Sequence, residues 1–584
     1  MIHPQRPRLA IFRFLPLPLN RAPSRCVFRS KTRPAFLSSE VQEPSAGWQG
    51  NQITTTKTRR SAIKDTTISQ SPSRVSLSNR LAPGIAPVCC LALVRVLIYL
   101  VAAPNYGYFR DEMYYLACGE HPAWGYMDQP PLIAWIAWLL EHTIGVSLYA
   151  LRLLPMLADV GCIVITGLFA RKLGGGRWAM FLASLAVLIA PIYLAFSHLF
   201  TMNAFDPLLW TLIAWLLVDL VQTGREQNWI WVGFLTGITL LNKYGVLFFI
   251  AGLLAGVLFS RLRRSLAQPW FWAGVAIATL IALPNFLWQL HWNFPFVQLV
   301  KSVRQNGRDV MLPPLPYLAQ QSQMTGFVSS LLVLLALWFF VSAQGRRYGI
   351  LLCGFLSVLG CMLLLKGKFY YVAPVYPVVF APGAVLFEHL TERRLATWFR
   401  PVYALTMFLV GALIAPTAIP LLSIPQYIAY TKKLGIQQQK FENQQESRLP
   451  QIFADMVGWE DRVKIVANYV HSLPPEEQKV TAIGASNYGD AGAVDLFGPK
   501  YGLPKAISTA NNYWIWGPRE YTGESLILMD EDSPEKYVER CRSFRMVASP
   551  NDPYARPDEN RPMYHCVGLT PNLQSLWPKI KPWN

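Results

Sequence analysis

Long apolar segments separated by short polar stretches dominate the chain between residues 84 and 421. A helix needs about 20 mostly apolar residues to cross the hydrocarbon core of a bilayer. Eleven segments reach or approach this length, and we predict that each is a membrane-spanning helix. They are 84–104, 150–171, 178–197, 203–222, 229–242, 244–260, 270–290, 321–342, 348–365, 370–387 and 401–421.

Three polar segments lie between or after these spans: a first loop at 105–149, a middle loop at 291–320 and a tail at 422–584. In the first loop, the apolar stretch Leu132–Leu140 is too short to span and is expected to lie in the plane of the membrane interface. In the tail, Val480–Ala485 and Ser525–Met529 predict short strands. We therefore expect a mainly α protein: a transmembrane helical bundle (84–421) followed by a small α/β domain (422–584).

The composition agrees with a membrane protein. Hydrophobic residues make up 52% of the 584 residues and charged residues 15%, against about 25% charged residues in soluble proteins. Residues 1–80 differ from the rest, with fourteen Lys and Arg against three Asp and Glu and no apolar run of membrane length. They predict a disordered basic segment, compatible with a cytoplasmic tail, a transit-like peptide or a stretch upstream of the true start.

The other basic residues form five clusters beside apolar runs, where lipid headgroups explain them, so we expect no nucleic-acid partner. The clusters are Arg171/Lys172/Arg177, Arg225, Arg261/Arg263/Arg264, Arg346/Arg347 and Arg393/Arg394/Arg400. With eleven spans and the N-terminus inside, all five fall on the cytoplasmic side; with ten, the later ones fall outside. This favours two short helices at 229–260, with Lys243 near the external face, and an extracytoplasmic tail. A disulfide between Cys541 and Cys566 of that tail is then predicted.

The first loop concentrates acids and aromatic residues. Asp111 and Glu112 follow the first span next to Arg110, and Asp128 precedes the short apolar stretch. Carboxylates accept hydrogen bonds from sugar hydroxyls, and aromatic faces cover sugar rings, so this pattern favours a sugar site. On charge pattern alone, a helix cap or a solvated loop explains Asp111 and Glu112 equally well, and Arg110 fits an interface anchor.

A resemblance decides between these interpretations. The segment YFRDEMYYLACGEHPAWGYMDQPPL (108–132) resembles the first external loop of the GT-C superfamily of membrane glycosyltransferases, in the branch of protein O-mannosyltransferases and lipid A aminoarabinose transferases. The segment KGKFYYVAP (366–374) is similar to a Lys-x-x-Tyr-x-x-Pro element that opens a late span in that branch. FTMNAFDPLLW (200–210) and LLNKYGVLF (240–248) also look similar to segments of the family, so the likeness covers about residues 84–390.

The resemblance implies a bacterial inner-membrane enzyme. It would transfer a glycosyl group from a polyprenyl-phosphate-linked sugar to a lipid, glycan or protein acceptor on the outer face, with inversion. Asp111 and Glu112 are the implied catalytic carboxylates, with Asp111 as the base. The implied substrate-binding residues are Arg110, Tyr115, Tyr126, Asp128, Lys366, Lys368 and Tyr371.

Among the implied substrate contacts, the cations would neutralise the lipid phosphate. Gln129 stands where aminoarabinose transferases carry Lys, which favours a neutral sugar. We expect no cofactor, because no Gly-rich phosphate loop is present, although the acids leave room for a divalent metal.

Two other function classes stay open: a multi-pass transporter and a lipid-binding assembly protein without transferase activity. A transporter should show internal repeats and broken helices at the bilayer midplane, whereas the ionisable residues here gather toward one face. Lesser candidates for the site are Asn203, Asp206, His291, Lys301, Arg304 and Arg308. The tail motifs SNYGDAGAVDLFGPKYGLP (486–504) and NNYWIWGP (511–518) receive no role.

Overall fold

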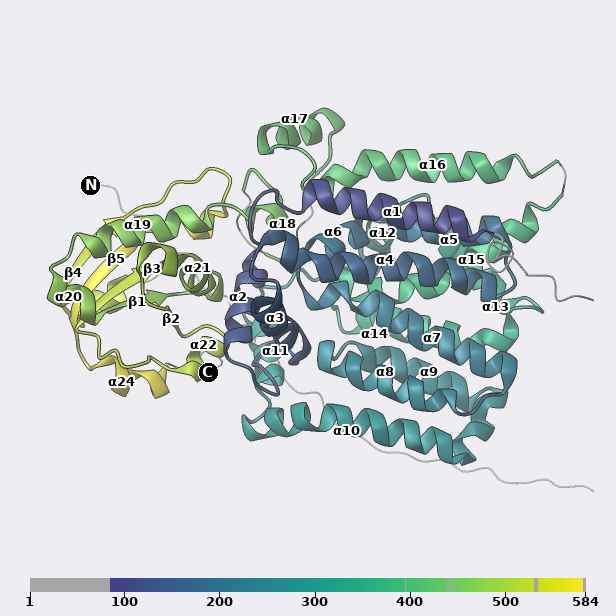
Figure 1. Cartoon of the computed structure of the whole chain (residues 1–584), viewed down its shortest axis with the longest axis horizontal. Coiled ribbons are helices and arrows are strands. Elements are labelled where there is room, and N and C mark those ends of the chain that lie inside the picture. The colour runs from purple at the N-terminus through teal and green to yellow at the C-terminus, as the bar shows by residue number, and fades with distance from the viewer. Residues whose placement is uncertain are drawn as a thin grey trace, which may run out of the picture. The chain divides into compact units, whose positions relative to one another are not determined.

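The computed structural model describes residues 84–393, 395–437, 440, 442–443, 445, 447–529 and 534–580. The prediction for residues 1–80 lies outside this part of the chain, as does Arg394 of the last basic cluster. Figure 1 shows the long helices of the bundle running side by side, and a mixed sheet formed by the C-terminal part of the chain.

Seven segments in the described part are long and apolar enough to cross a membrane alone. They are α1 (Ile85–Ala102), α4 (Leu148–Lys172), Met202–Thr223 with α7 (Asp206–Thr223), α10 (Pro269–His291), Arg346–Leu364 with α14 (Gly349–Leu364), Phe369–Leu390 with α15 (Tyr376–Leu390), and Phe399–Thr417 with α16 (Phe399–Ile414). Three further pairs meet the same requirement together but are sharply bent. They are α5 (Arg177–Ile189) with α6 (Pro191–His198), α9 (Val246–Leu258) with Arg261–Ala267, and α12 (Pro314–Thr325) with α13 (Ser330–Val341).

These helices account for ten of the eleven predicted spans, and α8 (Asn228–Asn242) occupies the eleventh segment. The chain between 229 and 260 is split as expected, because α8 ends at Asn242 and α9 begins at Val246. At about 1.5 Å per residue, the fifteen residues of α8 are shorter than a bilayer core of about 30 Å. A side chain on Gly233 of α8 would meet the backbone of Gly274 in α10, so these helices touch at the level of their backbones.

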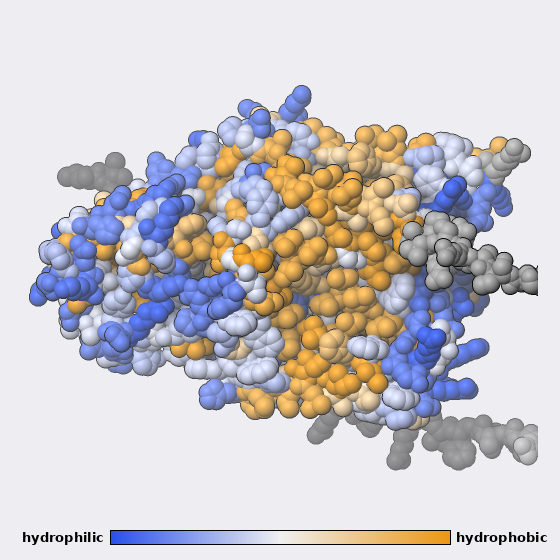
Figure 2. All heavy atoms as spheres, viewed as in Figure 1, coloured by the Kyte–Doolittle hydropathy of each residue, from blue (hydrophilic) through white to orange (hydrophobic). Residues whose placement is uncertain are grey.

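The outer surface of the bundle is apolar. Leu97 and Val101 of α1, Leu280 of α10 and Leu405 of α16 are all more than half exposed. Figure 2 shows hydrophobic side chains over the bundle, with hydrophilic ones beyond both ends of the helices. A continuous exposed surface of this kind fits contact with lipid, and the chain is an integral, multi-pass membrane protein.

Short helices gather at the end of the bundle where the loops 105–149 and 291–320 lie. They are α2 (Arg110–Glu120), α3 (Leu132–Thr143) and α11 (Pro295–Gln305), followed after the bundle by α17 (Ile424–Leu434). Helix α3 contains the stretch expected in the interface plane, and this apolar helix of twelve residues is indeed too short to span.

The C-terminal domain is an α/β unit. Its strands are β1 (Thr481–Ala485), β2 (Ile507–Ser508), β3 (Ser525–Met529), β4 (Cys541–Ala548) and β5 (Met563–Leu569), in the order β2-β1-β3-β5-β4. Its helices are α18 (Gln451–Ala454), α19 (Trp459–His471), α20 (Pro475–Val480), α21 (Tyr488–Phe497), α22 (Asn512–Trp516), α23 (Glu535–Val538) and α24 (Leu573–Leu576). Strand β1 runs parallel to β2 and β3, whereas β5 is antiparallel to β3 and β4. Both predicted strands are confirmed.

The disulfide between Cys541 and Cys566 is present and joins the neighbouring strands β4 and β5, with 5.5 Å between the Cα atoms. The bundle and this domain pack together as one compact unit. The C-terminal domain therefore lies where it can contribute side chains to the end of the bundle.

Candidate active site

A cavity of about 330 Å³ lies at the end of the bundle that carries the C-terminal domain. Segments from very different parts of the sequence line it: the start of α2, α6, the middle loop, the segment before α15, and residues of the C-terminal domain. Its wall includes Arg110, Asp111, Asp128, Lys368 and Tyr371, five of the nine residues expected at the site. The first loop and the 366–371 segment meet there, although more than 200 residues separate them in the sequence.

Asp111 lies in the first turn of α2, and its carboxylate accepts a hydrogen bond from the hydroxyl of Tyr488 at 2.9 Å. Burial raises the pKa of Asp111, and the Tyr488 hydrogen bond and the charge of Arg110 partly oppose this shift. A carboxylate with a raised pKa is a better proton acceptor than an ordinary aspartate.

Asp128 forms a second carboxylate on the same wall. It accepts hydrogen bonds from the Tyr114 hydroxyl at 2.8 Å and from the Asn511 amide at 3.0 Å. Burial raises the pKa of Asp128 to about 6, and the nearby Asp111 contributes in the same direction. No cation is paired with either carboxylate among the ion pairs of the described residues, so both are held by neutral donors.

Glu112 was expected beside Asp111 as a second catalytic carboxylate, but its side chain is not among those that line the cavity. Its side chain is fully buried and binds Arg152 at 3.0 Å, the backbone N–H of Phe200 at 2.9 Å and that of Phe109 at 2.8 Å. Neighbouring residues of a helix point about 100° apart. Asp111 therefore faces the cavity, while Glu112 closes the first turn of α2 and ties it to α4.

A second wall of the cavity carries cations. The Lys368 ammonium lies 3.2 Å from Asp309 and 3.2 Å from Glu442, and the Arg308 guanidinium lies 3.0 Å from the second oxygen of Glu442. Burial disfavours the ionised form of Glu442, but Arg308 and Lys368 outweigh it and hold the pKa at about 2. A single oxyanion is thus already held between two cations.

Three other expected residues are outside the cavity. Lys366 is exposed at the end of α14. Tyr126 is buried, and its hydroxyl donates to the carbonyl oxygens of Cys118 and His121 at 2.9 and 3.0 Å, which holds the loop between α2 and α3. Tyr115 is buried against Phe200. The structure gives Tyr115 and Tyr126 places in the core of the loop and Lys366 a place on the surface.

Of the lesser candidates, Asn203 and Arg308 line the cavity. Asn203 accepts a hydrogen bond from Lys243 at 2.5 Å, and the Lys243 ammonium lies 4.4 Å from the centre of the Tyr371 ring. Asp206 is buried behind them and accepts a hydrogen bond from Asn242 at 2.7 Å. It supports the wall as a partner within the bundle.

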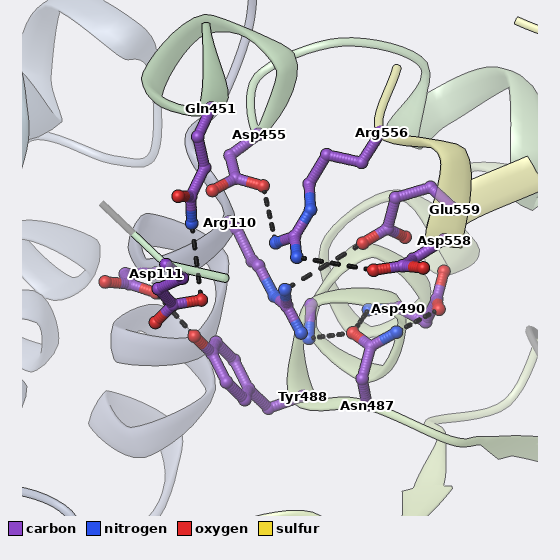
Figure 3. Close-up of polar contacts among 12 residues, drawn as sticks. Arg110, Asp111, Gln451, Asp455, Asn487, Tyr488, Asp490, Arg556, Asp558 and Glu559 are labelled. Carbon is purple, nitrogen blue, oxygen red and sulfur yellow. Dashed lines mark hydrogen bonds and ion pairs between the residues drawn. The ribbon is translucent and has the colours of Figure 1, made fainter. Parts of the chain in front are cut away.

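Several cavity residues could not be assigned from the sequence: Tyr488, Asn511, Glu442, Asp455 and Arg556. Tyr488 and Asn511 belong to the two tail motifs that received no role. Their composition was the available signal, because an aromatic or amide residue among Gly and Asn residues fits a binding loop as well as an ordinary turn. Figure 3 shows Tyr488 pointing toward Asp111, with Arg110 beside it.

Arg110 lines the cavity but is held mainly by the C-terminal domain. Its guanidinium lies 4.5 Å from the centre of the Tyr488 ring and 3.9 Å from Glu559. Within the described residues, no group of three or more metal-ligating side chains comes together. The expectation that no cofactor takes part stays a prediction.

Residues 128–288 match the family described as dolichyl-phosphate-mannose-protein mannosyltransferase. A lipid A galacturonosyltransferase, RgtD of Rhizobium johnstonii, is 26% identical over 209 residues, which are 35% of this chain and 43% of that protein. The matched region thus spans less than half of the length of that relative.

Two solved structures share the fold. They are crystal structures of ArnT from Cupriavidus metallidurans, one bound to undecaprenyl phosphate and one in the apo state. Each is 14% identical, covers 82% of this chain and aligns with a TM-score of 0.52; the shares of the ArnT chain covered are 97% and 98%. The chain therefore shares the fold of the ArnT structures, which agrees with the resemblance of the first loop.

Proposed function

We propose that this chain is a glycosyltransferase that takes its sugar from a polyprenyl-phosphate carrier and transfers it to an acceptor at the membrane surface. The observation that carries the proposal is the cavity itself. Two carboxylates with raised pKa values, Asp111 and Asp128, share it with two cations, Arg308 and Lys368. The relatives whose names describe sugar transfer, and the ArnT structure described as bound to undecaprenyl phosphate, support the same chemistry.

The reaction requires a base and an electrophile with a stabilised leaving group. Asp111 accepts the proton of an acceptor hydroxyl, and the oxygen attacks the anomeric carbon of the donor sugar. The bond between that carbon and the phosphate oxygen breaks, and the lipid phosphate leaves with the electron pair. A single displacement inverts the anomeric centre. Asp128 orients the sugar or the acceptor by accepting hydroxyl hydrogen bonds.

The leaving phosphate gains negative charge, which the cationic wall stabilises. The Glu442 carboxylate binds both Arg308 and Lys368. A lipid phosphate presents the same kind of oxyanion, so it takes the place of Glu442 between these cations. Tyr371 lies on the same wall and donates a further hydrogen bond.

The donor is a sugar on a polyprenyl phosphate, whose chain stays in the lipid beside the bundle. Gln129, at the position where aminoarabinose transferases carry Lys, is fully buried and its amide contacts the Cys118 sulfur at 3.7 Å, away from the cavity. Because Gln129 does not line the cavity, its identity does not select the donor sugar. The donors to compare are polyprenyl phosphates that carry a neutral hexose or a uronic acid. The name of the Rhizobium relative describes transfer of a uronic acid, galacturonate.

The protein would lie in a bacterial inner membrane, with the cavity and the C-terminal domain outside and the N-terminus in the cytoplasm. The five basic clusters support this orientation, since short cytoplasmic loops collect Lys and Arg. The disulfide in the C-terminal domain also requires an oxidising compartment. A cysteine replacing the exposed Lys536 should react with a membrane-impermeant maleimide in intact cells, whereas one replacing Arg346 should react only after permeabilisation. The reverse result would contradict the orientation.

Transfer is tested on the full-length chain in nanodiscs with radiolabelled undecaprenyl-phosphate-linked mannose and galacturonate, using bacterial membranes as the source of acceptors. Radiolabel should move to an acceptor with the wild-type chain and not with D111N. An equal signal from both chains, or none from either with any donor, would contradict the proposal. Repeating the assay with EDTA tests the expected metal-free reaction, for which the rate should not change.

A further inference from the structure

Helix α21 of the C-terminal domain packs against helix α2 of the first loop at backbone distance. A Cβ atom added to Gly492 would lie 3.0 Å from the Met113 carbonyl carbon, and one added to Gly489 would lie 2.7 Å from the Arg110 side chain. Glycines four or fewer residues apart on one helix face let two helices approach closely. The C-terminal domain is therefore docked onto the helix that carries Asp111.

The start of α21 is fixed by a cap. The Asn487 side-chain oxygen accepts hydrogen bonds from the backbone N–H groups of Gly489 and Asp490, at 2.8 and 3.0 Å, as an N-cap residue does. This cap fixes the backbone at Tyr488, the first residue of the helix, and so the direction in which its side chain leaves the helix. Its ring lies between the Arg110 guanidinium and the Tyr114 ring, 4.5 and 5.1 Å from its centre.

A second segment of the same domain reaches the other carboxylate. Asn511 donates to Asp128 at 3.0 Å, and the next residue, Asn512, accepts a hydrogen bond from the backbone N–H of Met127 at 2.7 Å. Asn511 has φ +48 and ψ −135, a backbone conformation that non-glycine residues rarely adopt. Strain of this kind persists where the surrounding contacts require it, and it is common at functional sites.

We propose that the C-terminal domain completes the active site, with Tyr488 and Asn511 as positioning residues that aim the carboxylates of Asp111 and Asp128 into the cavity. This inference rests on the proposed function and names two residues that orient the carboxylates of the same site. The two residues donate to the carboxylates from the side of the C-terminal domain. Each leaves the remaining lone pairs of its carboxylate for substrate, because a carboxylate accepts about four hydrogen bonds. A carboxylate held by a rigid neighbour is oriented before the substrate arrives, which lowers the barrier to proton transfer.

The main test is Y488F in the full-length chain, because this change removes only the hydroxyl and keeps the ring. The charged or titratable groups around Asp111 are Arg110 of α2, Tyr488 of α21, Arg308 of the middle loop, Glu442, Asp128, Tyr115 and Tyr370. Of these, Y488F removes the hydroxyl that donates a hydrogen bond to Asp111. The ionised form of Asp111 loses a hydrogen bond, so its pKa should rise, and the acid limb of the pH–rate profile should move up by about one pH unit.

The expected effect of Y488F is a fall in kcat of about tenfold near neutral pH, with unchanged affinity for undecaprenyl phosphate. Y501F is the matched control, since the Tyr501 hydroxyl also donates to a carboxylate, that of Glu460, at 2.6 Å in the same domain but outside the cavity. It should keep both kcat and the pH profile. A Y488F chain with the kcat and acid limb of the wild type, or with a lower kcat and an unshifted limb, would overturn the positioning role.

N511A provides an independent variant. It should lower kcat for the sugar donor several-fold and leave the affinity for undecaprenyl phosphate unchanged. The acid limb assigned to Asp111 should stay at the same pH. Wild-type kinetics in N511A would remove Asn511 from the proposal. Infrared difference spectra taken across the titration, with the Asp111 band identified by D111N, measure the titration of Asp111 independently of donor turnover. If no donor is turned over, the proposed function fails, while a higher Asp111 titration midpoint in Y488F than in the wild type still supports the contact and an equal midpoint refutes it.

Discussion

The two walls of the cavity hold their charged groups in opposite ways. On one wall, neutral hydroxyl and amide donors hold the carboxylates of Asp111 and Asp128. On the other wall, carboxylates hold the cations of Arg308 and Lys368. Burial therefore raises the pKa values of the first pair of carboxylates, while ion pairing keeps Glu442 ionised. One wall is suited to accepting a proton and the other to exchanging one anion for another.

The largest effect should come from D111N, which keeps the shape of the side chain and removes its basicity. Turnover of the donor should fall by about 10²–10⁴, the usual range for loss of a general base, with donor binding nearly intact. The measurement is kcat together with undecaprenyl phosphate affinity in nanodiscs. D461N serves as control, because Asp461 is an exposed acid of the C-terminal domain. Equal losses in both variants would assign the effect to net charge.

On the cationic wall, K368A should weaken undecaprenyl phosphate binding by about tenfold or more, since a charge-assisted contact to phosphate is lost. The loss should be larger at low salt, where charge attraction is least screened. K366A is the matched control two residues away, because Lys366 is exposed and lies outside the cavity. Titrations of both variants at two salt concentrations check this. Similar losses in K366A would mean that the segment binds phosphate in another conformation.

The pH dependence sharpens the contrast between the walls. A base must be ionised to act, so activity should fall as the pH drops through the raised pKa of Asp111, by about tenfold per pH unit below it. Two neighbouring carboxylates raise each other's pKa, so D128N should move the acid limb of the residual activity to lower pH. This is opposite to the shift expected for Y488F. An acid limb that stays in place in D128N would show that the two groups titrate independently.

The smallest effect is expected from E442Q, which removes the anion already held between Arg308 and Lys368. Undecaprenyl phosphate should then bind a few-fold tighter, because it no longer displaces a carboxylate from the same cations. Isothermal titration of E442Q beside E460Q, whose acid lies outside the cavity, measures this. Weaker binding in E442Q would mean that Glu442 orders the cationic wall instead of occupying it.

The bundle was predictable because hydropathy and span length carry most of the information about membrane helices. The split at 229–260 followed from the placement of arginines and lysines. The site was harder. Asp111 and Glu112 are equivalent in the sequence, and only the direction of each side chain in the first turn of α2 separates them. Lys366 and Lys368 differ in the same way, one exposed and one in the wall.

The contributions of the C-terminal domain could not be predicted from the sequence. Tyr488 and Asn511 reach the carboxylates through contacts between residues that are more than 370 positions apart. Such contacts depend on the docking of α21 onto α2, which no local pattern encodes. The disulfide was predictable for a simpler reason, since Cys541 and Cys566 are the two cysteines of the tail.

The order of the cavity residues along the chain has a consequence for biosynthesis. The wall begins with Phe109 and ends with Arg556, so the ribosome makes all of the bundle and the C-terminal domain through β4 before the last wall residue emerges. Domains form from the N-terminus during synthesis, and the bundle can be inserted while the C-terminal domain is still being made. A partly made chain thus sits in the membrane without a finished cavity, and the complete set of charged groups is assembled only after the tail has folded onto α2.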